Sequence, residues 1–209
     1  MESFTRIRAT AAPMMRINID TDQIIPTRFL LRTSEEGLNE GLFANWRSLA
    51  DGTPDPEFIL NRAPYDRAEI ILTDRNFGCG SSREAAPRAL RQSGFRAVIA
   101  PSFGDIFFGN CFRNGVLPVI LPIETVNALV QQVASSHGTA PIEVDLEHER
   151  VTAPDGLTFA FVTPKKLRDM LLNGLDEIDL TMQLDDSIAR FRATDRAKRP
   201  WAYLERGSY

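Results

Sequence analysis

The stretch Glu69-Ile70-Ile71-Leu72-Thr73-Asp74, followed shortly by Asn76-Phe77-Gly78-Cys79-Gly80-Ser81-Ser82-Arg83-Glu84, decides the fold. Its first part is an apolar run typical of a buried strand, and residues 85–92 have helical composition. A strand, a glycine turn and a helix start together present backbone N–H groups and a partial positive charge. Two serine hydroxyls and a guanidinium lie at the same point. The stretch therefore predicts a site for a carboxylate or a phosphate.

The run Ser81-Ser82-Arg83-Glu84 has two interpretations. It fits an S-x-x-E capping box, in which the serine caps a helix and the glutamate reaches back to it. Pro87 opposes that arrangement, because a proline inside a helix removes a hydrogen bond and clashes with the preceding turn. A helix that starts near Pro87 would instead leave an irregular turn that faces a ligand. Gly78 and Gly80 permit a positive φ or the close approach of a ligand.

The middle of the chain alternates between apolar runs and helical segments. Residues 95–100 and 116–121 predict two further buried strands. Helices are expected from a cap at Ser102 to about residue 114, and over residues 123–136. This alternation predicts a parallel sheet with crossover helices.

Both ends of the chain have a different pattern. Residues 14–19 are short and β-like, while residues 142–161 hold runs that alternate apolar and polar side chains, as half-buried antiparallel strands of a smaller second sheet do. One helix is expected to open at Thr163-Pro164, with Pro164 as its first residue, and to close at Asn173-Gly174, and a second is expected over residues 185–192. We expect residues 1–192 to form one domain and residues 193–209 a C-terminal tail, either disordered or packed on a partner.

The composition excludes several classes of protein. A net charge of −4 and a pI near 5.3 argue against binding to nucleic acid. No apolar run approaches the ~20 residues that span a membrane, and the N-terminus lacks the apolar core of a secretory signal, so we expect a cytoplasmic protein without membrane contact. Two cysteines, Cys79 and Cys111, and two histidines cannot build a disulfide framework or a four-ligand metal site, so no metal is expected in this chain.

Three familiar chemistries do not fit the glycine-rich stretch. There is no G-x-S-x-G, and His137 and His148 stand in polar, turn-like contexts typical of solvated residues. No G-K-S/T follows the glycines, and Arg83 stands where a dinucleotide fingerprint has its third glycine. Cys79 between glycines could have a lowered thiol pKa, but an inert packed thiol is the simpler interpretation. What remains is an anion site, in which Arg83 and helix-start amides could stabilise a serine alkoxide.

A second polar segment, Asn18-Ile19-Asp20-Thr21-Asp22, precedes this stretch. Its residue types favour Asx turns and helix caps, so it either caps the following segment or forms a polar loop at the mouth of the site. Arg28 and Arg32 are four residues apart and share a face on a helical turn. They are either solvated or clamp a substrate carboxylate bidentately.

At these residues the chain resembles a known family, the small subunits of 3-isopropylmalate dehydratase, within the aconitase superfamily. The matching segments are 18–30, 76–84, 101–107 with Asn110, and 173–181. The resemblance implies a three-layer β/β/α swivelling domain that closes over a larger subunit. That subunit would carry a 4Fe–4S cluster and would form a heterodimer or heterotetramer with this chain.

The resemblance also implies roles for individual residues. Ser81 would be the alkoxide that takes and returns the proton on the carbon next to a carboxylate. Ser82, Arg83 and Arg32, and more weakly Arg28, would bind the substrate, a small dicarboxylic hydroxy acid. The loop residues that would line the site are Asp20, Thr21, Asp22, Gly78 and Gly80. The implied reaction converts 2-isopropylmalate to 3-isopropylmalate by dehydration and rehydration in leucine synthesis, with the partner's iron acting on the leaving hydroxyl.

Two departures from the family pattern bear on the substrate. Ala85 and Arg88 stand where relatives have histidine and tryptophan, and Ser34-Glu35-Glu36-Gly37-Leu38 replaces Thr-Arg-Thr-Gly-Phe. One alternative is therefore a paralogous small subunit that acts on another alkylmalate, methylmalate or citraconate-type acid. Another is a non-catalytic anion-binding module, although such a module has no need of both hydroxyls of Ser81 and Ser82.

Overall fold

The computed structural model describes residues 1–30 and 37–203 and divides the chain into two units, Met1–Gly174 and Leu175–Tyr209. The first unit contains two four-stranded sheets. The parallel sheet has the order β2 (Ala11–Met14), β3 (Ile70–Thr73), β4 (Ala97–Ala100) and β5 (Leu117–Ile120). The antiparallel sheet has the order β1 (Arg6–Ala9), β6 (Ile142–Asp145), β7 (Arg150–Thr152) and β8 (Thr158–Ala160). The predicted α/β class with both kinds of sheet is confirmed, although the antiparallel sheet has as many strands as the parallel one.

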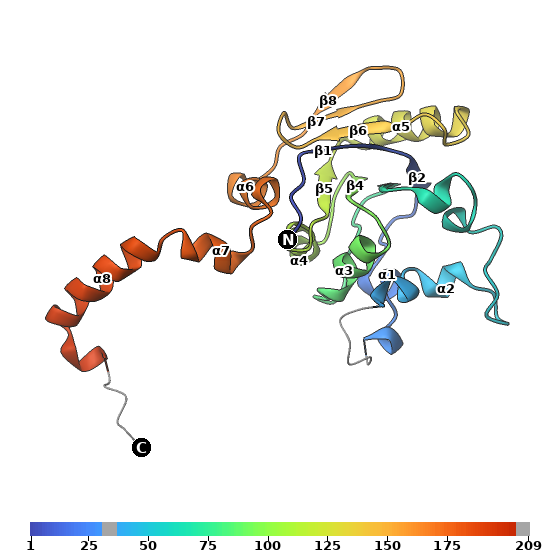
Figure 1. Cartoon of the computed structure of the whole chain (residues 1–209). Coiled ribbons are helices and arrows are strands. Elements are labelled where there is room, and N and C mark those ends of the chain that lie inside the picture. Colours follow the sequence, from blue (N-terminus) through green and yellow to red (C-terminus); the bar gives the residue numbers. More distant parts are fainter. Residues whose placement is uncertain (31–36, 204–209) are drawn as a thin grey trace. The chain divides into compact units, whose positions relative to one another are not determined.

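Helices connect and cover the strands of this unit (Figure 1). They are α1 (Thr21–Ile24), α2 (Ala44–Arg47), α3 (Ala85–Gln92), α4 (Asp105–Arg113), α5 (Ile123–Ser135) and α6 (Lys165–Asn173). Single 3₁₀ turns lie at Thr27–Phe29, Leu38–Gly41, Ile59–Asn61 and Tyr65–Arg67. Helix α3 connects β3 to β4 and α4 connects β4 to β5, as expected for crossovers in a parallel sheet. Among the described residues, no helix combines the length and the apolar character needed to cross a membrane.

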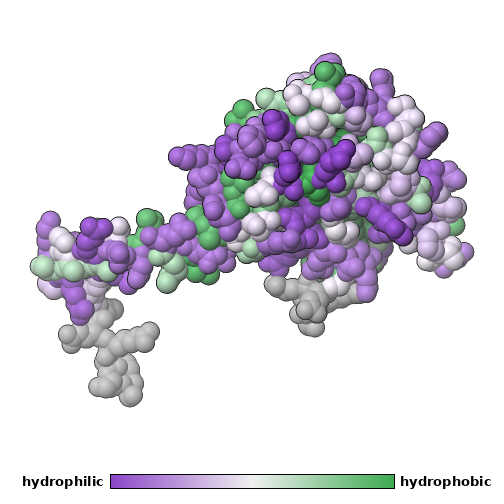
Figure 2. Space-filling model, turned by 45° about the horizontal axis from the view of Figure 1, so that its top comes forward, coloured by the Kyte–Doolittle hydropathy of each residue, from purple (hydrophilic) through white to green (hydrophobic). Residues whose placement is uncertain are grey.

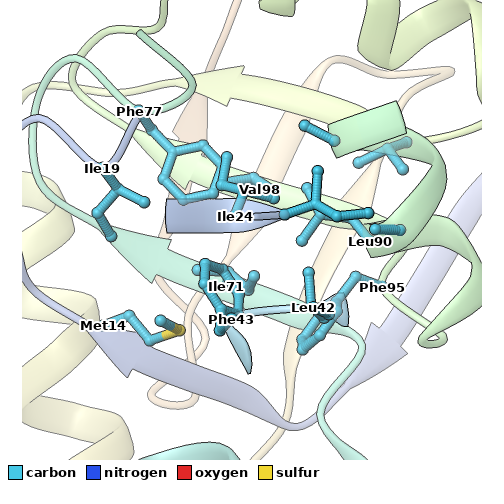
Figure 3. Packing of buried hydrophobic residues seen from close by; sticks show 14 of the residues in the cluster. Met14, Ile19, Ile24, Leu42, Phe43, Ile71, Phe77, Leu90, Phe95 and Val98 are labelled. Atoms are coloured by element: carbon cyan, nitrogen blue, oxygen red, sulfur yellow. The ribbon is translucent and has the colours of Figure 1, made fainter. Parts of the chain in front are cut away.

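The parallel sheet is buried on both faces. Ile71 of β3 and Val98 of β4 are paired in register and lie in one cluster with Ile24 of α1 and Leu90 of α3 (Figure 3). On the opposite face, α5 packs against β2, β3 and β4. Full burial of such an aliphatic side chain contributes about 1.5–3 kcal/mol. This two-sided burial explains why the strands are continuous apolar runs.

The N-terminal strands differ from the expectation. The strand predicted over residues 14–19 is wrong, because β2 ends at Met14 and Asn18 has a positive φ of 55°. The N–H of Asn18 donates instead to the carbonyl of Arg75, at 3.0 Å. Before it, β1 and β2 were not predicted, and β1 pairs with β6 from far along the chain.

The first unit ends at Gly174, which caps α6 in the left-handed conformation (φ 67°). The N-terminal ammonium of Met1 donates to the carbonyl oxygen of Gly174, at 2.8 Å. The second unit contains α7 (Glu177–Met182), α8 (Asp185–Lys198) and a 3₁₀ turn at Pro200–Ala202. The expected boundary between residues 192 and 193 falls inside α8, so the helix runs six residues further than its predicted end.

No residue of α7 or α8 is buried. Large apolar side chains of this unit are exposed, and Figure 2 shows hydrophobic residues among the hydrophilic ones along the segment. They are Ile178, Met182, Leu184, Phe191 and Trp201. Helix α7 is held locally by a capping box, in which Asp176 and Asp179 each accept a hydrogen bond from the other's backbone N–H.

Candidate functional site

Three loops meet at the carboxyl ends of β2, β3 and β4, where ligands bind in open parallel sheets. Parallel backbone pairing continues past the strands into these loops. It joins Asp20 to Cys79 and Phe77 to Phe103. The segment 18–22, the glycine-rich stretch and the segment before α4 are therefore joined through their backbones.

The two glycines of the stretch have different roles. Gly78 has φ +71°, and a Cβ built on it would lie 2.1 Å from the ring of Phe107. The ring of Phe107, on α4, therefore leaves room only for a glycine at this position. The Gly78 N–H donates to the carbonyl of Ile19, at 2.7 Å. Gly80 has φ +88°, but the nearest atom to its Cβ position is the Cβ of Asp20, at 3.5 Å. Position 80 therefore requires glycine for its positive φ, and not because a side chain would collide with a neighbour.

Residues 81–84 form an irregular turn, as the second interpretation predicted. Helix α3 begins at Ala85 with Glu84 as its N-cap and without a side-chain capping hydrogen bond, so the capping box is not formed. Pro87 lies in the first turn, where a missing N–H removes no intrahelical bond. The helix therefore starts two residues before the predicted Pro87.

This turn leaves several donors free. Ser81 and Ser82 are exposed, and neither hydroxyl has a hydrogen-bond partner within residues 1–30 and 37–203. In the same ranges, the backbone N–H groups of Ser81, Ser82 and Arg83 have no acceptor. Unpaired hydroxyls and amides next to a helix N-terminus suit a bound anion.

Arg83 is held in place by the loop after β2. One nitrogen of its guanidinium (Nη1) lies 2.6 Å from Oδ1 of Asp22 and 3.4 Å from the carbonyl oxygen of Ile25. The Arg83 side chain is only 17% exposed. Asp22 also accepts a hydrogen bond from the hydroxyl of Thr27, at 3.1 Å. Asp22 thus fixes the direction in which the guanidinium presents its other donors.

Asp20 and Thr21 support the turn from the other side. Asp20 caps α1 by accepting the N–H of Gln23, at 2.7 Å. The N–H of Thr21 donates to the carbonyl of Cys79 (3.0 Å) and its hydroxyl to the carbonyl of Ser81 (2.9 Å). The capping interpretation of segment 18–22 is therefore confirmed for Asp20, and Thr21 in addition positions the serine turn.

Of the two arginines predicted to bind substrate, only Arg28 lies among the described residues. Arg28 lies in the turn Thr27–Phe29, donates to Oδ1 of Asn45 at 2.7 Å and lies 4.9 Å from the ring of Phe29. It is thus directed to α2. Arg32 lies outside the described residues, as do Ser34, Glu35 and Glu36 of the loop that differs from the family pattern.

A pocket of about 260 Å³ lies between the turn and α4. Its lining consists of Gly78, Cys79, Gly80, Ser81, Gly104, Asp105, Ile106 and Phe107. Neither Asp105 nor Ile106 was among the site residues expected from the sequence, although both side chains are exposed.

One residue of the sequence, Gly104, could have indicated this pocket. Gly104 stands directly before α4, and a Cβ there would lie 2.6 Å from the carbonyl oxygen of Gly78. The predicted cap at Ser102 is wrong, because Gly104 is the N-cap of α4. The Ser102 hydroxyl instead accepts the N–H of Asn76, at 2.9 Å, and so ties two of the loops together.

The cysteines do not fit an iron–sulfur cluster, which requires thiolate ligands. Burial raises the pKa of the Cys79 thiol, and the charge of Asp20 raises it further, which is the opposite of the lowering considered for its position. Burial raises the pKa of the fully buried Cys111 well above its ordinary value. In the described ranges, no three His, Cys, Asp or Glu side chains are grouped as a metal site would need.

Comparisons with known proteins agree with the fold. The family model described as the Aconitase C-terminal domain matches residues 1–124, and one described as LeuD_N matches residues 127–162. A protein from Cupriavidus necator named 3-isopropylmalate dehydratase small subunit is 51% identical over 207 residues, which cover 98% of this chain and all of that protein. Proteins of the same name from Gluconacetobacter diazotrophicus and Agrobacterium fabrum are 49% and 46% identical, over 96% and 97% of this chain and 97% and 100% of their own lengths.

A solved structure extends the likeness to three dimensions. It is the crystal structure of 3-isopropylmalate dehydratase from Methanocaldococcus jannaschii, with a TM-score of 0.64 and 26% identity. The match covers 88% of this chain and 98% of the other.

Proposed function

Because the chain belongs to the family of 3-isopropylmalate dehydratase small subunits, we propose that it forms half of the active site of a hydro-lyase in leucine biosynthesis. The enzyme isomerises 2-isopropylmalate to 3-isopropylmalate by removing water and adding it back with the hydroxyl on the neighbouring carbon. The observation that carries the assignment of the site is the turn at Ser81–Ser82, whose hydroxyls and amides are free beside Arg83.

Ser81 is the residue that moves the proton. Its alkoxide takes the proton from the carbon next to a carboxylate, the electron pair forms the double bond, and the hydroxyl leaves from the adjacent carbon. In the return direction Ser81 gives the proton back. A serine alkoxide is too basic to persist unaided at neutral pH, so the free amides of residues 81–83 and the N-terminus of α3 must stabilise it.

Arg83 and Ser82 bind a carboxylate of the substrate. Both contacts of the Arg83 guanidinium, to Asp22 and to Ile25, use Nη1. The edge formed by Nε and Nη2 is therefore left for a bidentate pair with a carboxylate. The free hydroxyl of Ser82 adds a donor on the same turn. Asp22 acts as a positioning residue, because it orients the guanidinium without needing to touch the substrate.

The remaining half of the site belongs to the large subunit. We assign a 4Fe–4S cluster to that subunit, since the thiols of this chain do not fit one; when bound, it supplies the Lewis acid for the leaving hydroxyl. The pair would assemble in the cytoplasm as a heterodimer or heterotetramer. Arg28 and Arg32 remain proposed carboxylate ligands for the closed complex.

A paralogous substrate is the second candidate, and the altered loop at residues 34–38 motivates it. The other departure weakens it, because Arg88 is engaged by Asn114 (3.2 Å) and Glu84 (3.1 Å) and does not line the pocket at Ser81. A module that only binds anions is the third candidate, and it would bind a dicarboxylate without turnover.

Anaerobic co-expression with the large subunit tests the proposal. The absorbance of the unsaturated intermediate is followed with 2-isopropylmalate, 3-isopropylmalate, methylmalates and citraconate. The highest kcat/KM with the isopropylmalates is expected. A higher kcat/KM with another acid would assign the chain to the paralogue, and an assembled pair that turns over none of them would contradict the hydro-lyase proposal.

A further inference from the structure

Helix α4 carries an exposed face beside the pocket of Ser81. Asp105, Ile106 and Arg113 are exposed on it and Gly109 is half-buried, whereas Phe107 on the other side of the helix is buried. Positions 105, 109 and 113 are four apart and therefore lie in one row along the helix. Ile106 is 58% exposed, although its side chain is large and apolar.

No packing contact within residues 1–30 and 37–203 requires a glycine at position 109. A glycine inside a helix destabilises it relative to alanine. At Gly78 and Gly104, by contrast, an added Cβ would collide with a neighbour. At Gly109, nothing in the described part of the chain lies within 4 Å of an added Cβ, and φ is not positive. What a helical glycine on an exposed face still permits is the close approach of another backbone.

We propose that the outer face of α4, made of Asp105, Ile106, Gly109 and Arg113, is a contact surface for the large subunit. This inference rests on the proposed function. Ile106 and Asp105 form a wall of the pocket that contains Ser81. A chain that completes the site at Ser81 must therefore cover this wall, and Gly109 follows one helical turn beyond it.

The composition of this face fits a contact between two proteins. An apolar side chain, Ile106, is flanked by an acidic residue, Asp105, and at the far end by a basic one, Arg113. Interfaces place apolar residues at the centre and charged residues at the rim. Ile106 is therefore the residue whose loss should weaken assembly most.

The first experiment compares Ile106→Asp with Leu157→Asp. Leu157 is 60% exposed and lies between β7 and β8, so it matches Ile106 in exposure but not in location. An aspartate at the second position of α4 suits the helix N-terminus, so the fold should persist. Binding of the holo large subunit is measured anaerobically by biolayer interferometry. We expect the Kd to rise at least about tenfold for Ile106→Asp and to stay within about twofold for Leu157→Asp.

The second experiment uses Gly109→Ala, for which a structural role and an interface role predict different outcomes. In the isolated subunit the added methyl meets open space, so the urea midpoint should rise. In the complex the methyl occupies the space that the partner's backbone needs, so the Kd should rise severalfold or more. A merely structural role would leave the Kd unchanged.

Unchanged Kd values for both α4 variants would overturn the inference, as would failure of the wild-type pair to assemble. If Ile106→Asp instead abolishes self-association of the isolated subunit and leaves the Kd for the large subunit unchanged, the surface belongs to a second copy and the inference is also wrong. A wild-type pair that assembles but turns over no alkylmalate would contradict only the proposed function, because binding would still report on this face.

Discussion

Replacing Gly78 with alanine should destabilise the subunit strongly, because two separate costs add. The positive φ of +71° costs an L-residue about 1–2 kcal/mol. The added Cβ would also lie 2.1 Å from the ring of Phe107, which is 3% exposed and packs edge-on against Phe77 with 5.4 Å between ring centroids. Such overpacking adds about 1–3 kcal/mol. The sum is a loss of about 2–5 kcal/mol.

Gly80→Ala is the matched control, because it carries only the first of these costs. Its φ is +88°, yet the nearest neighbour of its Cβ is at an ordinary contact distance of 3.5 Å. We expect a loss of about 1–2 kcal/mol for this variant. The difference between the two variants therefore measures how tightly the serine turn is pressed against α4.

Urea unfolding monitored by Trp46 fluorescence provides the assay, since Trp46 stacks on the buried Phe43 at 5.7 Å. Trp201, the second tryptophan, is replaced with phenylalanine throughout so that one signal remains. With a slope of about 2 kcal/mol per molar urea, the midpoint should fall by roughly 1–2.5 M for Gly78→Ala and by roughly 0.5–1 M for Gly80→Ala. Equal midpoints for the two variants would refute the packing argument.

Two further predictions concern charged side chains. Asp22→Asn should raise the KM of the assembled enzyme severalfold, because Arg83 loses the carboxylate that orients it. The free energy of unfolding should change by less than about 1 kcal/mol, because the Asp22 carboxylate is half-exposed. A KM that stays equal to that of an Asp51→Asn control would remove Asp22 from its positioning role. Asp145 is 3% exposed, and although burial acts to raise its pKa, hydrogen bonds from the N–H and ring of His148 outweigh that effect and lower it. Its ionised form therefore stabilises the fold above the unfolded pKa of about 3.9, and this stabilisation is lost as the pH falls through the lowered pKa. Asp145→Asn should cost about 1–3 kcal/mol at pH 7 in urea unfolding, and the gap to wild type should narrow below about pH 4; a gap independent of pH would contradict this assignment.

Three strands of the parallel sheet, β3, β4 and β5, could be predicted from the sequence because the sheet is buried on both faces. Every residue of Ile70–Thr73 is buried, so the strand is one uninterrupted apolar run between polar neighbours. Arg6–Ala9 was missed for the opposite reason. That strand is short, carries two arginines and depends on pairing with Ile142–Asp145, which is distant in sequence.

The serine turn was predictable because its hydroxyls, glycines and arginine are contiguous. The wall opposite was not, because Ile106 reaches Ser81 only through the packing of two separate loops. The end of α8 was misplaced because half of its last six residues are charged and none is large and apolar, as in a tail. The ion pair between Asp195 and Arg199, at 2.8 Å and four residues apart, shows how such a segment supports a helix.

The central claim is that Ser81 carries the proton in the reaction, and Ser81→Ala in the anaerobically assembled enzyme tests it most directly. We expect kcat to fall by about 10²–10⁴-fold or more, while the Kd for the large subunit stays unchanged. Ser135→Ala, an exposed serine at the end of α5, should keep full activity. A Ser81→Ala enzyme that retains kcat within about tenfold of wild type would contradict the account.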